Sequence, residues 1–484
     1  MTAVPVEELT GQFLLARDGG RVPATWTTRS AAGWALGTNQ LPVRDLVDPA
    51  GRVNGWLVGH PVLDGALGTG PVPLSTSDPR RLDWRAVDGL LDRLAGRFLL
   101  VLLPEDEPTV VLDAYGSLAA VWSAAEQVVA STATLTSAPE DTDLAEATGF
   151  PHRSTWLPFG LTLRRGVHRL QANHALDLRT WTPRRHWLPP EVRDDLPTAD
   201  RAMAVYEQVR ATITAVAAVH PLSLSLTAGR DSRLVLACAR DVLDRASFFT
   251  LVNDGPGAVD VVTARRLADR FGLDHTLVPV GRASELGLQR SLEVTGAAVG
   301  GELWRAHEAL QQLDPDRVLL AGTAGEVARA KTWRPGDPVT GTVTPELLLR
   351  RMRLPALDVY LDGAGTWLRA LPDLPYSTVL ELAYVEQRLS CWAGPGHYGN
   401  RTSRFELPPF ASRRLFSTAL SLPVAYRYTE QLMDDICRRV WPELLDLPFN
   451  QHTGLRQVRA QARRVTRRLR TVVPRRTTPA RDGV

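Results

Sequence analysis

Residues 221–237 read PLSLSLTAGRDSRLVLA, and this stretch decides the fold. Residues 223–226 alternate polar and apolar side chains, which predicts a short strand. A turn of small and polar residues follows at 227–232, and an apolar run from Leu234 predicts a helix. A strand, a tight turn and a helix that opens on hydroxyls leave unpaired backbone N–H groups at one point, where the helix dipole also favours an anion.

Three side chains in this turn refine the predicted anion site. Thr227 and Ser232 add hydroxyl donors beside the backbone N–H groups. Asp231 would repel a phosphate on its own, so its presence implies a bridging magnesium ion. The alternative is an ordinary strand–turn–helix unit in which Asp231 only caps the helix, and the turn alone leaves both open.

The turn resembles the pyrophosphate-binding loop (PP-loop) of the ATP pyrophosphatases, whose pattern is Ser-Gly-Gly-x-Asp-Ser. Gly229, Asp231 and Ser232 match this pattern, while Thr227 stands for the first Ser and Ala228 for the first Gly. Threonine keeps the hydroxyl, whereas alanine keeps the small size but loses easy access to positive φ. The resemblance implies that the turn binds the phosphates of ATP.

A second motif follows further along the chain, where residues 318–326 read VLLAGTAGE. It resembles the Leu-Leu-Ser-Gly-x-Gly-x-Asp-Glu motif of the asparagine synthetase family, at the spacing that this family uses. Gly322 matches, and Glu326 takes the place of the metal-binding Asp. Thr323 stands where several members have a Glu that takes part in acid–base work. The alternative is a plain strand end, with Glu326 as a surface acid at a helix start.

The two motifs together imply one chemistry. By the resemblance, Asp231 and Glu326 share Mg²⁺ against the phosphates of ATP, so ATP and Mg²⁺ are the expected cofactors. A substrate carboxylate then attacks the α-phosphorus and gives an acyl-adenylate and pyrophosphate. The residues expected to bind ATP and pyrophosphate are Ser225, Leu226, Thr227, Ala228, Gly229, Asp231, Ser232, Thr250, Ala321 and Gly322.

Adenylation also needs a cation near the developing charge, which the family supplies with a lysine close to the helices that follow. Lys331 is the sole lysine in this chain and lies just past the second motif. It therefore joins Asp231 and Glu326 as an expected catalytic residue. An arginine such as Arg427 could stabilise charge but could not act as a general base.

Residues 195–455 are predicted to form one domain, because strands and helices alternate across them. This alternation predicts a parallel sheet with ligands at the carboxyl ends of its strands, and by resemblance the strand backbone at 249–251 holds adenine. His275 and His307 are further candidate bases by residue type. Besides the stretch described first, strands are predicted at 247–252, 275–280 and 318–320, and helices at 199–219, 259–271, 304–313, 345–351, 376–391, 413–420 and 430–440.

Residues 1–190 are predicted to form a separate domain of many strands, with one amphipathic helix at 83–94. The resemblance here is to the glutaminase domain of the asparagine synthetase family. It implies an overall α/β protein, in which an N-terminal α+β sandwich of the Ntn-hydrolase type precedes a parallel-sheet synthetase domain of the adenine nucleotide α-hydrolase type. The residues that carry this resemblance are Gly96, Phe98, Asp113, Gly116 and Ser131.

A working glutaminase of this kind uses an N-terminal cysteine whose own α-amino group is the base. The first cysteine in this sequence is Cys238, and Thr2 is the alternative nucleophile. The domain therefore resembles the degenerate glutaminase halves of the β-lactam synthetases and the lasso-peptide macrolactam synthetases. Its expected role is structural.

Composition excludes several function classes. The 484 residues carry 56 Lys+Arg and 53 Asp+Glu, and a net charge of +3 does not predict a nucleic-acid partner. Three widely spaced cysteines predict neither a disulfide framework nor a zinc site. The sequence shows no apolar run long enough for a transmembrane segment and no signal pattern, so we expect a cytoplasmic protein. Residues 456–484 hold ten arginines and one aspartate, which predicts either a solvated tail or a segment that binds an acidic partner.

The leading hypothesis is an asparagine synthetase-like, ATP-dependent, AMP-forming amide ligase that transfers a carboxylate to ammonia or an amine without glutaminase activity. Its substrates would be small molecules or peptides. The alternative is a non-catalytic homologue that acts as a binding or scaffold protein, which the missing lysine and Thr323 favour. A PP-loop enzyme that acts on RNA is a third hypothesis, against which the lack of basic patches in 195–455 argues.

Overall fold

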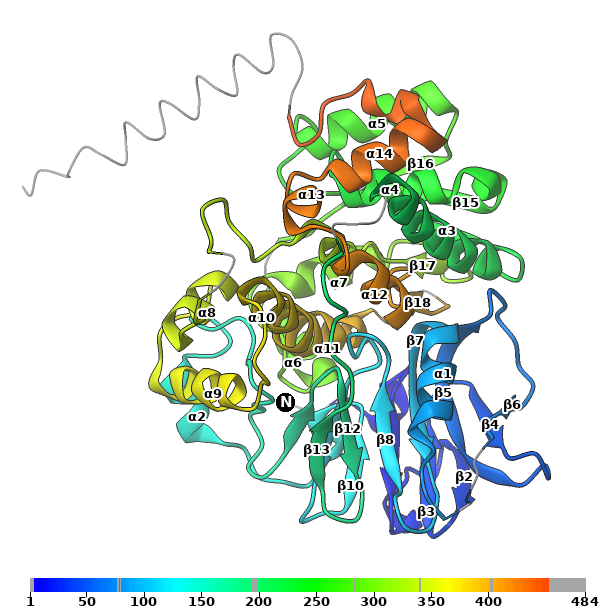
Figure 1. Ribbon diagram of the computed structural model, residues 1–484, viewed down its shortest axis with the longest axis vertical. Coiled ribbons are helices and arrows are strands. Elements are labelled where there is room, and N and C mark those ends of the chain that lie inside the picture. The colour runs from blue at the N-terminus through cyan, green and yellow to red at the C-terminus, as the bar shows by residue number, and fades with distance from the viewer. Residues whose placement is uncertain are drawn as a thin grey trace, which may run out of the picture.

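The computed structural model describes residues 4–75, 78, 80–193, 198–282, 284–338, 341–400 and 404–451. Strands dominate the first part of the chain, at the bottom of Figure 1, and helices dominate the second part above it. Thr2 and the Arg-rich tail at 456–484 lie outside the described residues, so the acidic partner of the tail stays a prediction. Within the described ranges, no helix combines the length and the apolar character that crossing a membrane requires.

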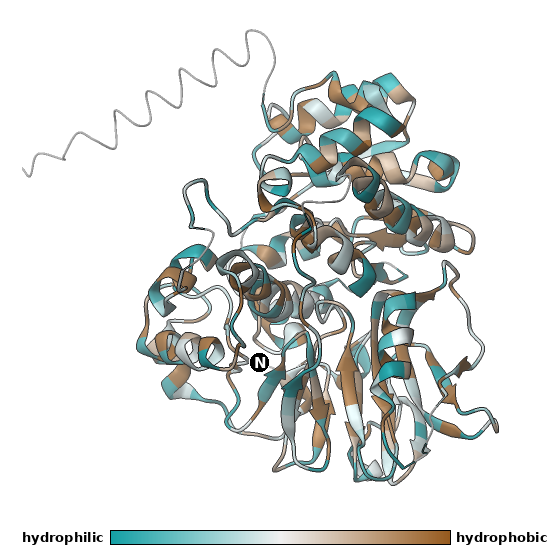
Figure 2. Ribbon diagram, viewed as in Figure 1, coloured by the Kyte–Doolittle hydropathy of each residue, from teal (hydrophilic) through white to brown (hydrophobic). Residues whose placement is uncertain are grey.

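Two largely antiparallel sheets face each other in the first part. One has six strands in the order β11-β9-β10-β1-β3-β2, and the other has seven in the order β13-β12-β8-β7-β5-β4-β6. Figure 2 shows the hydrophobic residues along these strands. The strands are β1 (Phe13–Ala16), β2 (Thr27–Ala31), β3 (Trp34–Thr38), β4 (Val43–Val47), β5 (Val53–Leu63), β6 (Val72–Pro73), β7 (Leu94–Leu102), β8 (Thr109–Leu112), β9 (Ala120–Ser123), β10 (Val128–Ala130), β11 (His168–Leu170), β12 (His174–Asp177) and β13 (Thr182–Arg185).

The central strand β1 of the six-stranded sheet is buried on both faces, and its side chains alternate between them. In β1, Phe13 and Leu15 face the core between the sheets, whereas the other two residues face α6 (Glu285–Thr295). On the far side, α1 (Trp84–Arg93) covers the seven-stranded sheet and is capped by Asp83. The sheet pair is thus enclosed by one helix from its own half and one from the other half.

The second part is built on a five-stranded parallel sheet in the order β16-β15-β14-β17-β18. The strand from the stretch 221–237, β14, lies in the middle of this sheet, so it carries the loop at 227–232 to the centre of the carboxyl edge. The register pairs Leu224 with Phe248 on one side and with Leu320 on the other. The strands are β14 (Leu222–Ser225), β15 (Ala246–Val252), β16 (His275–Pro279), β17 (Val318–Leu320) and β18 (Glu406–Leu407).

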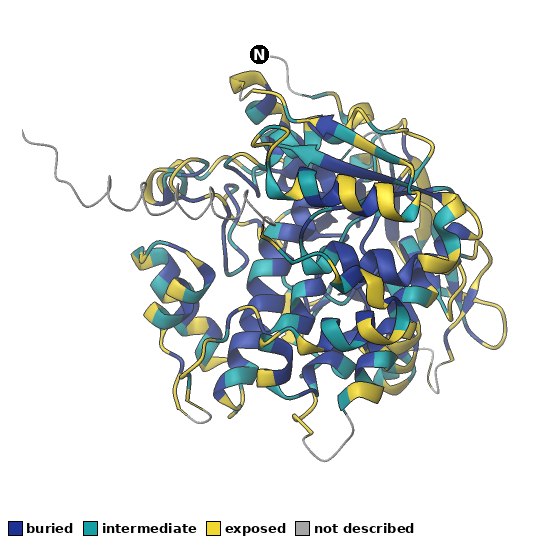
Figure 3. Ribbon diagram, turned by 90° about the horizontal axis from the view of Figure 1, so that it is seen from above, coloured by how far each residue is buried: buried dark blue, intermediate teal, exposed yellow. Residues whose placement is uncertain are grey.

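Helices cover both faces of this sheet. On one face lie α3 (Thr198–Ala217), α4 (Arg230–Cys238), α5 (Val259–Phe271) and α14 (Gln431–Val440), and on the other lies α7 (Leu303–Leu310). Figure 3 shows the buried residues concentrated on the inner sides of the helices. The remaining helices are α2 (Thr142–Thr148), α8 (Pro345–Met352), α9 (Asp358–Arg369), α10 (Tyr376–Ala383), α11 (Gly394–Gly396), α12 (Arg413–Leu420) and α13 (Val424–Tyr428).

The predicted fold class, an α/β protein with antiparallel sheets followed by a parallel sheet, is confirmed. The domain boundaries at 190 and 195 stay predictions. Several elements differ from the sequence-based expectation. The strand β18 and the helices α2, α6, α9 and α13 were not predicted, and the helix predicted at 376–391 is α10 followed by a π-helix at Tyr384–Ala393. β18 has only two residues, which is too short for a periodic signal.

Buried polar contacts join the two halves. The carboxylate of Glu386, in the π-helix, accepts two hydrogen bonds of 2.8 Å from Arg185 of β13 and one of 2.7 Å from Trp367. Between Tyr115 and β18, His397 lies 2.8 Å from the Tyr115 hydroxyl and 2.8 Å from the carboxylate of Glu406. The buried carboxylate of Glu386 and the ring of His397 thus have hydrogen-bond partners from both halves. Separating the halves would leave a buried charge without its partners.

One buried ion pair holds the second motif in place, and we predict its energetic cost. Arg427 donates to Glu381 at 2.7 Å and to the Val327 carbonyl at 3.1 Å, and both side chains are at most 6% exposed. Arg427→Met should lower the free energy of unfolding by about 3–5 kcal/mol, because it leaves Glu381 buried without a counter-charge. Chemical denaturation measures this change.

The matched control is Arg438→Met, whose partner Asp435 lies on the same exposed helix face. An exposed pair contributes only about 0–1 kcal/mol. Equal losses in the two variants would contradict the assignment of Arg427 and Glu381 as a buried ion pair that supports the second motif.

Candidate functional site

The loop at 227–232 joins β14 to α4 at the carboxyl edge of the parallel sheet. Its two hydroxyls bond to each other, since Thr227 Oγ1 lies 2.8 Å from Ser232 Oγ. Thr227 N donates to Ser232 Oγ at 3.2 Å, and Gly229 N donates to Thr227 Oγ1 at 3.1 Å. The hydroxyls therefore shape the loop, and an arriving anion would exchange these bonds for its own.

The neighbouring strand fixes the start of this loop. Leu226 N donates to Phe249 O at 2.8 Å. The buried Thr250 hydroxyl donates to Leu226 O at 2.6 Å and lies 2.8 Å from His275 Nε2. Thr250 and His275 thus form an anchor for the predicted phosphate loop, and their side chains point to each other rather than to an open cavity.

Two distant segments also contact the loop, and the sequence did not predict either. Ala228 N donates to Asp260 Oδ1 of α5 at 2.9 Å, and Asn450 N donates to Ala228 O at 3.0 Å. The guanidinium of Arg230 lies 3.9 Å from the ring centre of Phe449. The end of the described chain is therefore packed on the start of α4. The buried Arg233 secures it through the carbonyls of Leu444, Leu447 and Pro448.

The two predicted acids meet at one arginine. Asp231 Oδ2 accepts a hydrogen bond of 2.6 Å from Arg329 Nη2, and Glu326 Oε1 lies 4.0 Å from the same nitrogen. Asp231 belongs to the loop after β14, whereas Glu326 and Arg329 belong to the 3-10 turn Gly325–Arg329 after β17. The motifs predicted to act together are thus brought together in space, with a cation between them.

The backbone of the second motif is constrained. Ala324 and Ala330, on either side of the 3-10 turn, have φ of 73° and 45°, in the left-handed region that alanine rarely adopts. A Cβ added to Gly325 would lie 3.1 Å from Asp231 Oδ1, so the turn passes close to that carboxylate. Residues held in this region persist only when their surroundings impose it, which is common at ligand sites.

Charges of alternating sign extend from this pair to α14. Glu430 accepts a hydrogen bond of 3.2 Å from Arg329 Nη1 and also pairs with Arg230, which in turn pairs with Asp434. The side chain of Arg329 is only 12% exposed. Since each guanidinium bridges two or more carboxylates, α14 and both loops are held as one unit.

Burial raises the pKa of Asp231 to about 6, and Glu326 adds to the rise while Arg329 opposes it. For Arg329, burial lowers the pKa, but Asp231, Glu326 and Glu430 together raise it above its usual range. At neutral pH the two groups therefore stand as a charged pair. A perturbed carboxylate in a hollow next to a specific partner is a frequent sign of a functional site.

A cavity of about 280 Å³ opens beside these groups. Three parts of the chain form its wall: the loop after β14, the loop after β17, and the π-helix. The wall carries both apolar and polar side chains, which suits a ligand with both characters. The lining residues are Ser225, Thr227, Asp231, Ser232, Val235, Leu320, Gly322, Thr323, Glu326, Tyr384, Leu389 and Trp392.

The π-helix supplies site residues that sequence reasoning missed. Tyr384 and Trp392 line the cavity, and Arg388 stacks between Trp392 at 3.7 Å and Trp156 at 5.3 Å. Burial raises the pKa of Tyr384, and the nearby Glu326 raises it further. The sequence signal that could have identified them is the spacing of four residues between Arg388 and Trp392, which places both side chains on one face of a helix.

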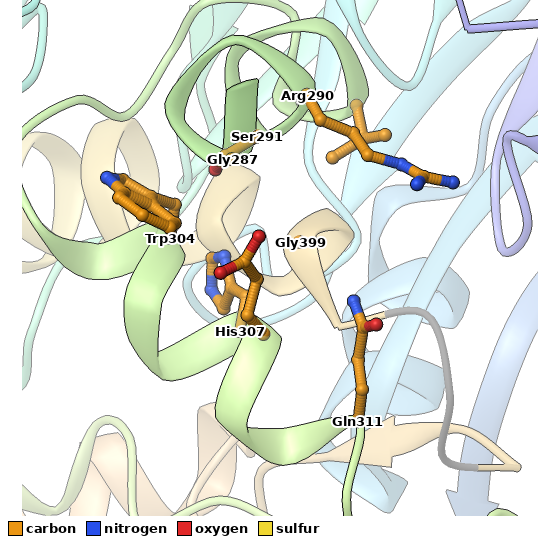
Figure 4. Close-up of a pocket in the computed structure, with 9 residues that line it drawn as sticks. Gly287, Arg290, Ser291, Trp304, His307, Gln311 and Gly399 are labelled. Atoms are coloured by element: carbon orange, nitrogen blue, oxygen red, sulfur yellow. The ribbon is translucent and has the colours of Figure 1, made fainter. Parts of the chain in front are cut away.

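The remaining predicted residues lie elsewhere. Lys331 is exposed and is not part of the cavity wall, and Arg427 is buried against Glu381. Ala321, at the end of β17, donates its N–H to Leu407 O at 3.3 Å. His307 lines a separate hollow of about 60 Å³ between α6 and α7, where Figure 4 shows it near Gly399.

The donor set fits a magnesium ion that arrives with nucleotide phosphates. Within the described ranges, no group of three or more acidic, histidine or cysteine side chains could hold a metal by itself. However, Mg²⁺ is usually held by one or two carboxylates together with substrate phosphates. Asp231 Oδ1 is buried without a hydrogen-bond partner, so it is available as such a ligand, and Glu326 is the second carboxylate within reach.

Comparison with solved structures gives a distant structural likeness. No family model and no curated protein matches the sequence. Among solved structures, the chain is similar to the glutamine-dependent NAD+ synthetase from Acinetobacter baumannii in complex with ADP. The identity is 18%, the match covers 65% of this chain and 52% of that chain, and the TM-score is 0.20. The chain therefore spans about half the length of that synthetase, and a superposition of this quality carries no argument about function.

The raised pKa of Asp231 predicts a pH-dependent stability. The pKa is about 6 in the folded chain against 3.8 for the ordinary group. Protonation therefore favours the folded state, and this contribution is present below pH 4 and lost as the pH rises through 6. Relative to Asp231→Asn, the wild type should lose stability between about pH 4 and pH 6, as measured by denaturant unfolding at a series of pH values.

The control is Asp358→Asn, which changes an exposed acid in the first turn of α9. Its stability curve should run parallel to that of the wild type. A parallel curve for Asp231→Asn as well would show that this carboxylate is not perturbed by burial.

Proposed function

We propose that this protein is an ATP-dependent, AMP-forming amide ligase that adenylates a carboxylate and transfers it to ammonia or an amine. One observation carries the proposal: Asp231 and Glu326, which follow adjacent parallel strands, converge on Arg329 and line one cavity. The carboxyl edge of a parallel sheet is where ligands bind in α/β proteins. The proposal includes a cytoplasmic location, where ATP is available.

The loop at 227–232 would bind the phosphates. The hydroxyls of Thr227 and Ser232 lie together at the start of α4, where the helix dipole adds positive potential. Asp231 and Glu326 would hold the magnesium ion that accompanies ATP, and this ion would offset the negative charge of the phosphates. The family resemblance at both loops supports the same assignment.

Adenylation forms one bond and breaks another. A carboxylate oxygen of the substrate attacks the α-phosphorus, the bond to the bridging oxygen breaks, and pyrophosphate leaves with that electron pair. Arg329 contacts Asp231 of the cavity wall, and Arg388 stacks on Trp392 of the same wall. We assign to these two cations the stabilisation of the charge that develops on the phosphoryl oxygens. An arginine suits this role because the task is to stabilise charge and not to move a proton.

The amide-forming step needs a neutral amine. Thr323 lines the cavity at the place where related enzymes carry a glutamate, and its hydroxyl cannot accept a proton at neutral pH. We therefore assign the loss of the amine proton to the substrates themselves or to the departing phosphate groups. The acyl-adenylate then gives the amide and AMP.

The direct test is the release of pyrophosphate and AMP from ATP and Mg²⁺ across a panel of carboxylates, with ammonia or simple amines present. The wild type should release both products in a carboxylate-dependent way. Asp231→Asn and Glu326→Gln should weaken Mg-dependent ATP binding by about 1–3 kcal/mol, or roughly 5- to 150-fold, because each loses a charge-assisted contact.

Glu285→Gln is the matched control, since this exposed acid lies in the first turn of α6. Release of ADP and phosphate would exclude AMP-forming chemistry. ATP binding without turnover for any carboxylate would favour the alternative, a non-catalytic binding or scaffold protein. Pyrophosphate release that is unaffected by Glu326→Gln would contradict the shared-metal assignment.

We also propose that the N-terminal half has no glutaminase activity. The sequence offers no cysteine before Cys238, and the residue just before β1 is Gln12. Its side chain is buried and satisfied: it donates to Val294 O at 2.9 Å and accepts from Ser131 at 2.9 Å and Thr132 at 2.8 Å. The cysteines Cys238, Cys391 and Cys437 are free and buried, and burial raises the pKa of each.

Incubation with glutamine should therefore release no ammonia above that released by a Thr2→Ala variant. The measurement is a coupled ammonia assay with and without ATP and substrate carboxylate. Ammonia release that disappears in Thr2→Ala would contradict the proposal and would identify Thr2 as a nucleophile.

A further inference from the structure

A second cavity, of about 620 Å³, lies between the two halves of the protein. From the first half it is lined by the β4–β5 region, and from the second half by Val219, His220, Arg404 and Phe405. These four residues precede β14 and β18, so the cavity lies at the amino edge of the parallel sheet, opposite the loop at 227–232. In Figure 1, β18 lies directly above β7 at this junction.

The cavity is positively charged. Its wall contains Arg44 and Arg404 and, among the residues that the structure describes there, no carboxylate. Arg44 Nε donates to Gly70 O at 2.6 Å, while its Nη1 is buried without a hydrogen-bond partner. A Cβ added to Gly68, which lines the cavity, would lie 3.6 Å from Arg44 Nη2, so the guanidinium lies against the cavity wall. Because no acid among the described residues of the wall offsets the charge of this guanidinium, an anion in the cavity would pair with it.

The pKa values of the two histidines in the wall, His60 and His220, also indicate positive charge in this cavity. Burial lowers the pKa of His60 to about 3, and Arg97 and His220 lower it further. Burial likewise lowers the pKa of His220, with added effects of Arg404 and Arg245. The permanently charged side chains that lower these pKa values, Arg97, Arg245 and Arg404, are all cations, and no acid is among the described groups that shift them.

The remaining wall is apolar and aromatic. The rings of His60 and Phe405 stack at 3.7 Å with an angle of 5°, and His220 meets Phe405 edge-on at 5.5 Å. Val219 is 52% exposed, which is unusual for a large apolar side chain in this protein, and Leu67 lies on the opposite wall. Such a surface gains free energy by covering an apolar or aromatic group.

We propose that this cavity binds an organic anion: a carboxylate or phosphate ester that carries an aromatic or aliphatic body. The anionic group pairs with Arg44 and Arg404, and the body lies on Phe405 and Val219. A volume of this size holds a small organic molecule. The site is separate from the adenylation cavity, because it lies at the other edge of the sheet and shares no lining residue with it.

The test is calorimetric titration of the full chain with phenyl phosphate and with phenylacetate. Both should bind and should compete with each other. Inorganic phosphate and benzyl alcohol, which each carry one half of the recognised chemistry, should bind at least about 10-fold more weakly, since each loses either the charged contact or the apolar one. Equal affinity for benzyl alcohol and phenylacetate would overturn the proposal.

Three variants locate the binding in this cavity. Arg44→Gln should weaken both anions at least about 10-fold through the lost charge-assisted contact. Val219→Asp should do the same, because it places a carboxylate at an exposed position of the wall. Val219→Lys, at the same position, should bind as tightly as the wild type or more tightly. The control Arg52→Gln, a 70% exposed residue paired with Asp48, should change nothing.

Phenyl phosphate has a second place where it could bind, the loop at 227–232. Binding that survives Arg44→Gln and Val219→Asp but is lost in Ser232→Ala would place the ligand at that loop and overturn the proposal. Because Val219 is half-exposed, both of its variants should fold. A difference between them therefore reports charge at the cavity and not loss of structure.

Discussion

The ion pair between Asp231 and Arg329 is the contact on which the geometry of the site depends. Asp231 follows the central strand β14, and Arg329 follows its neighbour β17, so the pair ties together the two loops that the sheet brings to one edge. Burial makes the carboxylate costly to ionise, and the guanidinium offsets that cost. Without this cation, two acids at adjacent strand ends would repel each other in a poorly solvated hollow.

The architecture of the parallel sheet could be predicted because its signals are local. Alternating and helical periods give β15, α5 and β16 to within a residue or two, and small-residue turns mark where the strands end. From the order of strands and helices, the meeting of Asp231 with the second motif follows, since parallel strands end at one edge. The family resemblance of the two motifs and the order of the strands both predicted that Glu326 lies near Asp231.

The rest of the site could not be predicted, because it is built from contacts between segments far apart in the chain. Asn450 and Asp260 contact the loop from two other segments of the chain. Tyr384 and Trp392 belong to a π-helix, which has more residues per turn than an α-helix and so is not predicted by the α-helical period. Lys331 was predicted to be catalytic because it is the sole lysine, whereas in the structure Arg329 is the cation that lies between Asp231 and Glu326. Residue type is a weak predictor of the catalytic cation, because an arginine can occupy the position that related enzymes give to a lysine.

The balance of charge around Arg329 argues for a further cation. The linked groups are four carboxylates, those of Asp231, Glu326, Glu430 and Asp434, and two guanidinium groups, those of Arg329 and Arg230. Among these ion-paired groups the carboxylates outnumber the guanidinium groups by two, and one oxygen of Asp231 has no partner. Lys331 and Arg388 act on Asp231 and Glu326 without an ion pair to either. A divalent ion would neutralise the excess within the ion-paired groups, and it would do so beside the loop that we propose binds the phosphates. The cluster therefore favours a metal together with a phosphate ligand over either one alone, which is the pairing that Mg²⁺ and ATP provide.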